Sequence, residues 1–197
     1  MSEHSLMVAM RDPKYTKELI DETALRLFVE KGIAETTIRD ISSAAGIAEG
    51  TLYRHYVSKE GLAWELFSKN FTAFAVELDQ LQRKHDTFKA KIEAMIRHYC
   101  TFFDKDPILF SYLLLELHGQ LRKVTPDMPN PVTVLRSVIG EGMARGEIPR
   151  KDREIAAAMV LGVVLHVAVS KVYGRTKQSL TALADSIVAA AWRVLEA

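Results

Sequence analysis

The stretch TIRDISSAAGIAEGTLYRHYVSK, residues 37–59, decides the fold of the N-terminal part of this chain. Thr37 is suited to cap a helix, and Asp40 places a negative charge in the first turn of that helix. Apolar residues then recur at helical spacing until Gly46, which marks a tight turn. A second short helix follows, so the stretch predicts a helix-turn-helix.

The start of the second helix is fixed by apolar residues rather than by a polar cap. If Ala48 is its N-cap residue, Ile47 and Leu52 stand where a hydrophobic staple places them. The same arithmetic pairs Val57 with Leu62 at the start of the next helix. Both entry angles are therefore predicted to be set by a pair of apolar side chains.

The remaining side chains of the second helix are expected to point outward. Leu52 and Tyr56 are four residues apart and would face the core, since such residues share one face of a helix. The exposed set comprises Glu49, Gly50, Tyr53 and Arg54, with Thr51 and His55 at the flanks. Donors, a small residue and an aromatic hydroxyl together suit a helix that enters the major groove of DNA. Lys59, beside a helix N-terminus, is suited to a phosphate oxygen.

Residues 17–66, and the run LRLFVEKGIAETTIRDISSAAGIAEGTLYRHYVSKEGL above all, closely resemble the DNA-binding region of TetR-type transcriptional regulators. The resemblance implies a three-helix DNA-binding head joined to an all-helical body that binds an effector and dimerises. It places phosphate contacts at Thr37, Thr51, Tyr53 and Lys59, and operator-dependent contacts at Ala48, Glu49, Gly50 and His55. The family often has serine where Ala48 stands, so the recognition helix lacks a side-chain cap worth about 1 kcal/mol.

The charge balance of the head predicts a low non-specific affinity for DNA. Residues 1–69 hold eleven acidic and nine basic residues. Non-specific DNA affinity depends mainly on the neutralisation of phosphates, so we expect it to be low. The predicted basic edge of the head consists of Arg39, Arg54 and Lys59.

The chain beyond Ser58 is divided by Asp, Asn, Pro and Gly into further helices, so the fold class is all-α with about nine helices. We expect a flexible N-terminal arm over residues 1–12, a helix-turn-helix domain over 13–57, and an effector-binding and dimerisation domain over 58–197. The last two helices are rich in small and β-branched residues, which favours a homodimeric four-helix bundle. The expected interface residues are Val160, Val163, Val167, Ala184, Ile187, Val188, Ala191, Trp192 and Leu195.

An apolar pocket with few polar groups is expected within the body. The candidate effector-binding residues are Phe71, Phe74, His98, Tyr99, Phe102, Phe103, Tyr112, Leu113, Glu116, Met143, Leu165 and His166. Each aromatic residue alone is more often core than ligand contact, and each lone histidine is more often a satisfied side chain than a ligand. No cofactor and no metal site are expected.

Two other classes of protein compete with this interpretation. A di-iron helical enzyme would need paired Glu-x-x-His motifs, and a hydrolase or nucleotide-binding enzyme would need HExxH, a phosphate-binding glycine loop or a nucleophilic triad. None of these is present in the sequence, so no enzymatic activity is expected. A non-DNA adaptor that uses its apolar helices for protein partners remains the second alternative.

Composition favours a cytoplasmic protein. The single cysteine, Cys100, cannot form an intrachain disulfide, and the N-terminal residues lack the pattern of a signal peptide. The apolar run over residues 155–169 falls short of the roughly 20 residues that span a membrane, so we expect a buried helix and no membrane partner. The resemblance thus predicts a cytoplasmic, ligand-responsive repressor that binds a palindromic DNA operator as a homodimer and is released by a small, largely apolar or aromatic effector.

Overall fold

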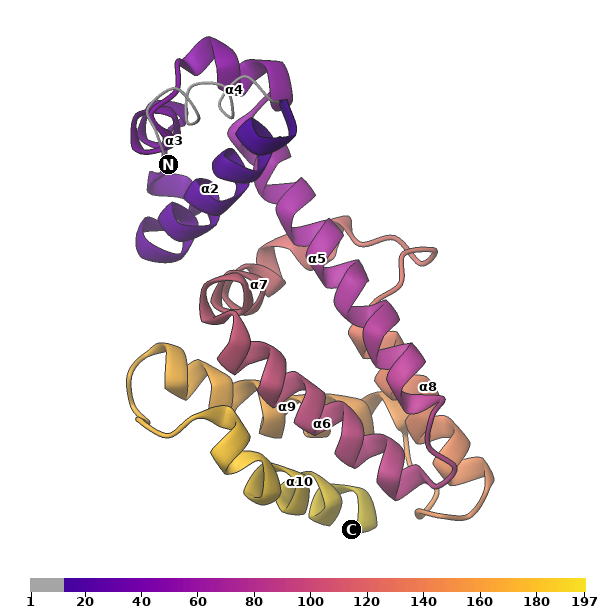
Figure 1. Ribbon diagram of the computed structural model, residues 1–197. Helices are drawn as coiled ribbons and strands as arrows, with labels where there is room; N and C mark the ends of the chain where they lie inside the picture. Colours follow the sequence, from indigo (N-terminus) through magenta and orange to yellow (C-terminus); the bar gives the residue numbers. More distant parts are fainter. Residues whose placement is uncertain (1–12) are drawn as a thin grey trace. The chain divides into compact units, whose positions relative to one another are not determined.

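The computed structural model describes residues 13–197, which form nine α-helices and one short 3-10 helix, without a strand in that range (Figure 1). The all-α prediction is therefore confirmed. The chain divides into two compact units, Met1–Ser68 and Lys69–Ala197. The boundary falls within a helix, eleven residues beyond the predicted domain end at residue 57. The predicted flexible arm lies outside the described residues.

The first unit contains α2 (Pro13–Glu35), α3 (Ile38–Ala45), α4 (Glu49–His55) and the beginning of α5 (Lys59–Gln82). Within α2, Gly32 has φ 83° and ψ 159°, a conformation that interrupts the helix and that side-chain-bearing residues rarely adopt. Thr36 then donates a hydrogen bond to the Gly32 carbonyl oxygen over 2.7 Å. Gly32 therefore ends the regular part of α2.

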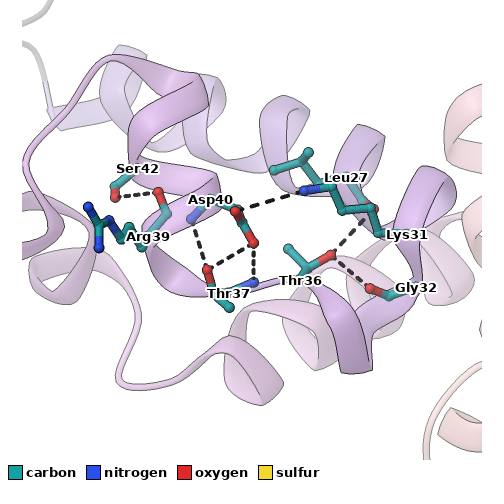
Figure 2. Close-up of polar contacts among 8 residues, drawn as sticks. All are labelled: Leu27, Lys31, Gly32, Thr36, Thr37, Arg39, Asp40 and Ser42. Atoms are coloured by element: carbon teal, nitrogen blue, oxygen red, sulfur yellow. Dashed lines mark hydrogen bonds and ion pairs between the residues drawn. The ribbon is translucent and has the colours of Figure 1, made fainter.

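Both ends of α3 are closed in the predicted way, and Figure 2 shows the contacts at its N-terminus. The Thr37 hydroxyl oxygen accepts a hydrogen bond from the Asp40 amide, and the Asp40 carboxylate accepts one from the Thr37 amide over 2.9 Å. This reciprocal pair is a capping box. At the other end, Gly46 is left-handed with φ 66°, which makes the turn into α4.

The second predicted staple differs from the structure. Val57 is 94% exposed although Leu62 is fully buried, so the two side chains do not cover each other. The start of α5 is held instead by the Ser58 hydroxyl, which accepts a hydrogen bond from the Gly61 amide over 3.0 Å. Tyr56 is buried, as its spacing of four residues from Leu52 predicts.

The second unit contains the rest of α5 followed by α6 (Phe88–Lys105), α7 (Pro107–Gln120), η1 (Leu121–Lys123), α8 (Pro131–Ala144), α9 (Arg153–Val172) and α10 (Leu180–Glu196). A polar side chain caps the N-terminus of each of the five α-helices from α6 to α10; these residues are Thr87, Asp106, Asn130, Asp152 and Ser179. Helix α10 packs along both α6 and α9 (Figure 1). Each of the helices from α6 to α10 therefore begins at a polar capping residue of the sequence.

The core of the body combines an aromatic group with aliphatic layers. Phe110 lies 4.6 Å from Tyr99 and 5.1 Å from Phe103 between ring centroids. At the far end of α6, Phe88 packs against α8, where a Cβ on Gly142 would come within 2.5 Å of the Phe88 ring. Glycine at that position therefore permits the close approach of α8 to Phe88.

Helix α9 is less buried than the sequence predicts. Among residues 13–197 it is the one helix long and apolar enough to cross a membrane by length and composition, and 28% of its most apolar window is buried within the chain. Ile155 and Met159 are more than half exposed. One face of α9 packs on α8 and α10, while the other face is not covered by any of residues 13–197.

The predicted dimer residues divide in the same way. Val160, Ala184, Ile187, Ala191 and Leu195 are buried in the core of the single chain, so they are not available to a second copy. The other four, Val163, Val167, Val188 and Trp192, are partly buried against that core. The predicted interface must therefore be corrected. The pattern of apolar residues selected the inward face of α9 and α10, because both faces of these helices carry small and apolar side chains.

Candidate DNA interface and effector cavity

Helix α4 presents the side chains that its spacing predicts to be outward. Glu49, Gly50 and Arg54 are exposed, and Tyr53 is 53% exposed. Leu52 is fully buried beneath them. Thr51 and His55 are half-buried at the flanks. A short helix held by one buried leucine and exposing polar, aromatic and basic groups has the surface that major-groove recognition requires.

The N-terminus of α4 lacks a side-chain cap. Ala48 has the extended conformation of an N-cap residue, with φ −71° and ψ 145°, and makes no side-chain hydrogen bond. Its carbonyl oxygen accepts hydrogen bonds from the amides of Thr51 and Leu52. The amides of the first turn therefore have no side-chain acceptor at Ala48, and the exposed Glu49 carboxylate stands beside them.

The C-terminus of α4 is anchored by a polar cluster that the sequence pattern did not predict. The buried Tyr56 hydroxyl donates a hydrogen bond to the Asp21 carboxylate and accepts one from the Lys17 ammonium. Lys17 also donates to Glu65 on α5 over 2.7 Å. Burial raises the pKa of Tyr56, and the hydrogen bond to Asp21 raises it further. This cluster joins α2, the end of α4 and α5.

The predicted cations of the interface differ in their freedom to bind phosphate. Arg39 and Arg54 are exposed and make no ion pair with any described residue, and the Arg39 guanidinium points away from the capping box (Figure 2). The Lys59 side chain is only 17% exposed and donates a hydrogen bond to the Ala34 carbonyl oxygen over 3.1 Å. Lys59 therefore holds the start of α5 against the end of α2.

Thr37 likewise makes hydrogen bonds within the protein, to Asp40 at the start of α3. Besides capping α3, its hydroxyl donates a hydrogen bond to the Asp40 carboxylate over 2.9 Å. The hydrogen bonds from the Thr37 amide and hydroxyl hold the pKa of Asp40 below its ordinary value, and Lys31, 3.8 Å away, contributes to the shift. The Thr37 hydroxyl therefore orients α3 in the free protein.

The body contains a partly open apolar cavity of about 100 Å³ between residues of α5 and those of α6 to α9. It is lined by Phe71, Phe74, Leu78, Ile92, Met95, Ile96, Tyr99, Phe110, Leu113, Leu114, Leu117, Pro131, Val132, Leu135, Val160, Leu161, Val164 and Leu165. Tyr99 is the one lining residue whose side chain carries an oxygen or nitrogen. The cavity suits an apolar guest.

Five of the twelve predicted effector residues line this cavity: Phe71, Phe74, Tyr99, Leu113 and Leu165. The other seven, His98, Phe102, Phe103, Tyr112, Glu116, Met143 and His166, lie elsewhere. His98 stacks on Phe74 at the surface with its Nε2 3.0 Å from Glu77. His166 is exposed, and burial raises the pKa of the half-buried Glu116. The sparse polar groups expected in the pocket are thus absent from its described lining, apart from Tyr99.

Most of the lining that the sequence pattern missed is aliphatic. Leu78, Ile92 and Leu135 lie on the same apolar stripes as ordinary core residues, and Val160 was assigned to the dimer interface. No local signal separates a leucine beside a cavity from a leucine in a filled core. Only the packing of five helices against one another leaves the space.

A redox or metal role finds no support in the described residues. Burial raises the pKa of the Cys100 thiol to about 11, which keeps it protonated. Within residues 13–197 no group of three or more His, Cys, Asp or Glu side chains is placed to hold a metal ion.

An exposed, anchored α4 above a helical turn defines a DNA-binding regulator of the helix-turn-helix class. Residues 20–66 match the family "Bacterial regulatory proteins, tetR family". The helix-turn-helix segment therefore matches the TetR family of transcriptional regulators, as its sequence motif predicts. Its relatives are transcriptional regulators, which confirms the prediction of a regulator rather than an enzyme.

The relatives cover different parts of the chain. The "Fatty acid metabolism regulator protein" of Bacillus subtilis is 26% identical over 181 residues, which cover 89% of this chain and 92% of that protein. The "HTH-type transcriptional repressor KstR2" of Mycobacterium tuberculosis is 35% identical over 86 residues, 40% of this chain and 43% of that protein.

A solved structure shares the fold over most of the chain. It is the transcriptional regulator FadR from Bacillus subtilis in complex with stearoyl-CoA, with a TM-score of 0.72 and 22% identity. The likeness covers 88% of this chain and 96% of that one. At this identity the match demonstrates a common fold for both the head and the body.

Proposed function

We propose that this regulator represses transcription in the cytoplasm by binding a palindromic operator as a homodimer, and that a long-chain acyl thioester in the body releases it. The observation that carries the proposal is the apolar cavity of the body, whose described lining contains no charged side chain. The relative named for fatty acid metabolism and the FadR structure with stearoyl-CoA support the same ligand class.

The DNA step rests on few contacts. Arg39 and Arg54 are the cations of the predicted edge that have no ion-pair partner among the described residues. Tyr53 and Gly50 stand exposed on the same helix as Arg54, where a base edge or a phosphate can reach them. The Lys59 ammonium donates one of its three N–H groups to the Ala34 carbonyl, so a phosphate there would bind the remaining donors.

The proposed dimer uses the outward face of α9 and α10. On α9 this face is apolar and follows helical spacing through Ile155, Ala158, Met159, Gly162 and His166. On α10 the exposed positions include Ala182, Ser186 and Ala189. A second copy would cover the half-exposed α9, and a two-fold dimer would offer two recognition helices to half-sites about 34 to 36 Å apart.

The size of the cavity suggests how a ligand acts. Its volume of about 100 Å³ is smaller than a cavity of ~150 Å³ that admits benzene, so a long acyl chain has to enlarge it. Phe71, Phe74 and Leu78 of its lining belong to α5, which runs without a break into the DNA-binding unit. Enlargement of the cavity therefore acts on α5, the helix that follows α4 in the chain. To release DNA, the ligand binds the DNA-incompetent state more tightly than the DNA-binding state.

The DNA role is tested by replacing Tyr53 and Arg54 together with alanine. We expect operator binding to fall by at least tenfold, measured by fluorescence anisotropy on a duplex selected from a randomised library. Circular dichroism and light scattering should show an unchanged fold and dimer. The matched control replaces Tyr173 and Arg150, an exposed tyrosine and arginine of the body. Equal losses in both double variants would overturn the assignment of α4.

The effector role is tested by adding stearoyl-CoA, coenzyme A or a micelle-free short-chain acyl-CoA to the protein–operator complex. We expect stearoyl-CoA alone to release DNA at micromolar concentration. The variant Leu135→Trp fills the cavity from α8 and should bind DNA but resist release. Release by coenzyme A alone, or full release of the tryptophan variant, would contradict the proposal.

A further inference from the structure

Tyr99 is the one residue lining the cavity whose side chain carries a polar atom, and its hydroxyl is buried rather than exposed on the apolar cavity surface. Its oxygen is buried and has no hydrogen-bond partner among the described residues. Two other side-chain oxygens share this condition, those of Gln82 and Gln120, and neither residue lines the apolar cavity. A buried polar group without a partner destabilises a fold, so its retention calls for an explanation.

The ring of Tyr99 is held by its neighbours. It meets Phe110 edge-on at 4.6 Å between ring centroids and Phe74 at 6.3 Å. These contacts fix where the hydroxyl lies. Burial raises the pKa of Tyr99 far above its ordinary value, so the group is a neutral phenol that can donate a hydrogen bond. A fixed donor beside a cavity is suited to a ligand acceptor.

We propose that the Tyr99 hydroxyl donates a hydrogen bond to a single uncharged oxygen of the effector, so that the site selects apolar molecules bearing a carbonyl group. The inference rests on the proposed role of the cavity as the effector site. A thioester, ester or ketone supplies such an oxygen. A free carboxylate is disfavoured because the described lining contains no cation to pair with it.

Two nearly isosteric probes separate the hydrogen bond from simple filling of the cavity. Ethylbenzene and acetophenone have similar size, and only acetophenone carries a carbonyl oxygen. Binding to the full-length dimer is measured by calorimetry, together with benzoate as the charged analogue. We expect acetophenone to bind several-fold more tightly than ethylbenzene, and benzoate to bind more weakly than either.

The variant Tyr99→Phe removes the hydroxyl and keeps the ring. We expect its affinity for acetophenone to fall by roughly five- to tenfold, since a net hydrogen bond is worth about 1 kcal/mol. Its affinity for ethylbenzene should be unchanged. The thermal midpoint of the ligand-free variant should be equal to or above that of the parent, because an unpartnered group has been removed. A merely structural hydroxyl would instead lower the midpoint.

The control variant is Tyr112→Phe, since Tyr112 is fully buried on α7 but does not line the cavity. It should leave the affinities for both probes unchanged. Equal affinity of the Tyr99→Phe variant and the parent for acetophenone would overturn the role of Tyr99 while leaving the cavity as a binding site. If neither probe binds the parent protein while stearoyl-CoA still releases the operator, the selection of small carbonyl compounds by Tyr99 is refuted; if stearoyl-CoA also has no effect, the effector cavity itself is refuted.

Discussion

The two units of this regulator place their functional groups in opposite environments. In residues 13–68 the proposed DNA-binding surface is the exposed face of α4, and it is oriented by polar contacts such as the capping box of α3 and the Lys17–Tyr56–Asp21 cluster. In residues 69–197 the candidate site is a cavity lined by aliphatic and aromatic side chains.

This difference explains why the two units respond differently to substitution. A side chain exposed on α4 can change with little effect on stability, because no neighbour depends on it. A side chain that borders the cavity belongs to the core, so recognition and stability are coupled there. The DNA-binding unit thus separates function from folding, while the body combines them.

The largest effect is expected where the body is most tightly packed. In Gly142→Ala, the new Cβ would lie 2.5 Å from the Phe88 ring, so α8 or α6 must shift. Overpacking costs about 1–3 kcal/mol or more, of which helix propensity returns up to ~1 kcal/mol. We expect a net loss of about 2 kcal/mol and a thermal midpoint roughly 4–8 °C lower. Differential scanning calorimetry measures this change.

Gly140→Ala is the matched control on the same helix. There the new Cβ meets nothing closer than the Arg153 Cδ at 3.9 Å, which is an ordinary contact. We expect a neutral to stabilising change of up to about 1 kcal/mol. Similar losses of stability in both variants would mean that α8 does not tolerate alanine at either position. Close packing on Phe88 would then not be the cause of the loss.

A pair of tyrosines tests the separation of function from folding within the DNA-binding unit. Tyr56→Phe removes a buried hydroxyl that bonds Asp21 and Lys17, and we expect it to cost about 1.5 kcal/mol. Tyr53→Phe removes an exposed hydroxyl and should change stability by less than ~0.5 kcal/mol while weakening operator binding. Hydrogen exchange of residues 49–62 and operator anisotropy measure the two effects. Parallel losses of stability in both variants would contradict the comparison.

The predictability of the two units follows from how far apart their interacting residues lie in sequence. Thr37 and Asp40 are three residues apart, so the pattern of a helix start predicts their mutual capping. Asp and Asn residues likewise divide the rest of the chain into helices, and Asn130 and Asp152 cap α8 and α9 in the structure. Lys17 and Tyr56 are 39 residues apart, and their contact exists only after α2 and α4 pack.

The cavity was harder to predict for a second reason. Aromatic and polar residues were predicted to be ligand contacts. This prediction includes Phe74 and Tyr99, which line the cavity, but also His98 and His166, which do not. Both histidines are at the surface, because a polar residue on a half-apolar helix can face solvent as easily as a pocket. Aliphatic lining residues carry the same pattern as filled core.

The missing cap of α4 provides the next prediction. Ala48→Ser introduces a hydroxyl at a residue that already has the extended conformation of an N-cap. We expect α4 to gain about 1 kcal/mol, which corresponds to roughly fivefold slower exchange of the amides in its first turn. Exchange in α6 should be unchanged. No change at α4 would show that the Glu49 carboxylate or the packing of Leu52 already fixes the helix start.

The smallest expected effect tests whether the body also depends on polar contacts between distant residues. Asp104, at the end of α6, accepts hydrogen bonds from the Leu180 amide over 3.0 Å and the Thr181 amide over 2.8 Å at the start of α10. Burial raises the pKa of Asp104, but the hydrogen bonds from Thr181 and Leu180 and the charge of Lys171 outweigh it, and the pKa lies below the ordinary value of 3.8.

A carboxyl group whose pKa is lower in the folded chain stabilises the fold above the unfolded pKa, and this stabilisation is lost as the pH falls through the folded pKa. We therefore expect Asp104→Asn to lower stability at pH 7 by less than about 1 kcal/mol, because the site is partly solvated. The difference from the parent should shrink below pH 3.8, where the parent's own carboxyl becomes protonated. Urea unfolding at pH 7 and near pH 3 measures both values. A stability difference that stays constant between pH 7 and pH 3 would mean that the charge of Asp104 does not contribute to stability. The start of α10 would then differ from the capping box of α3, where a carboxylate is involved.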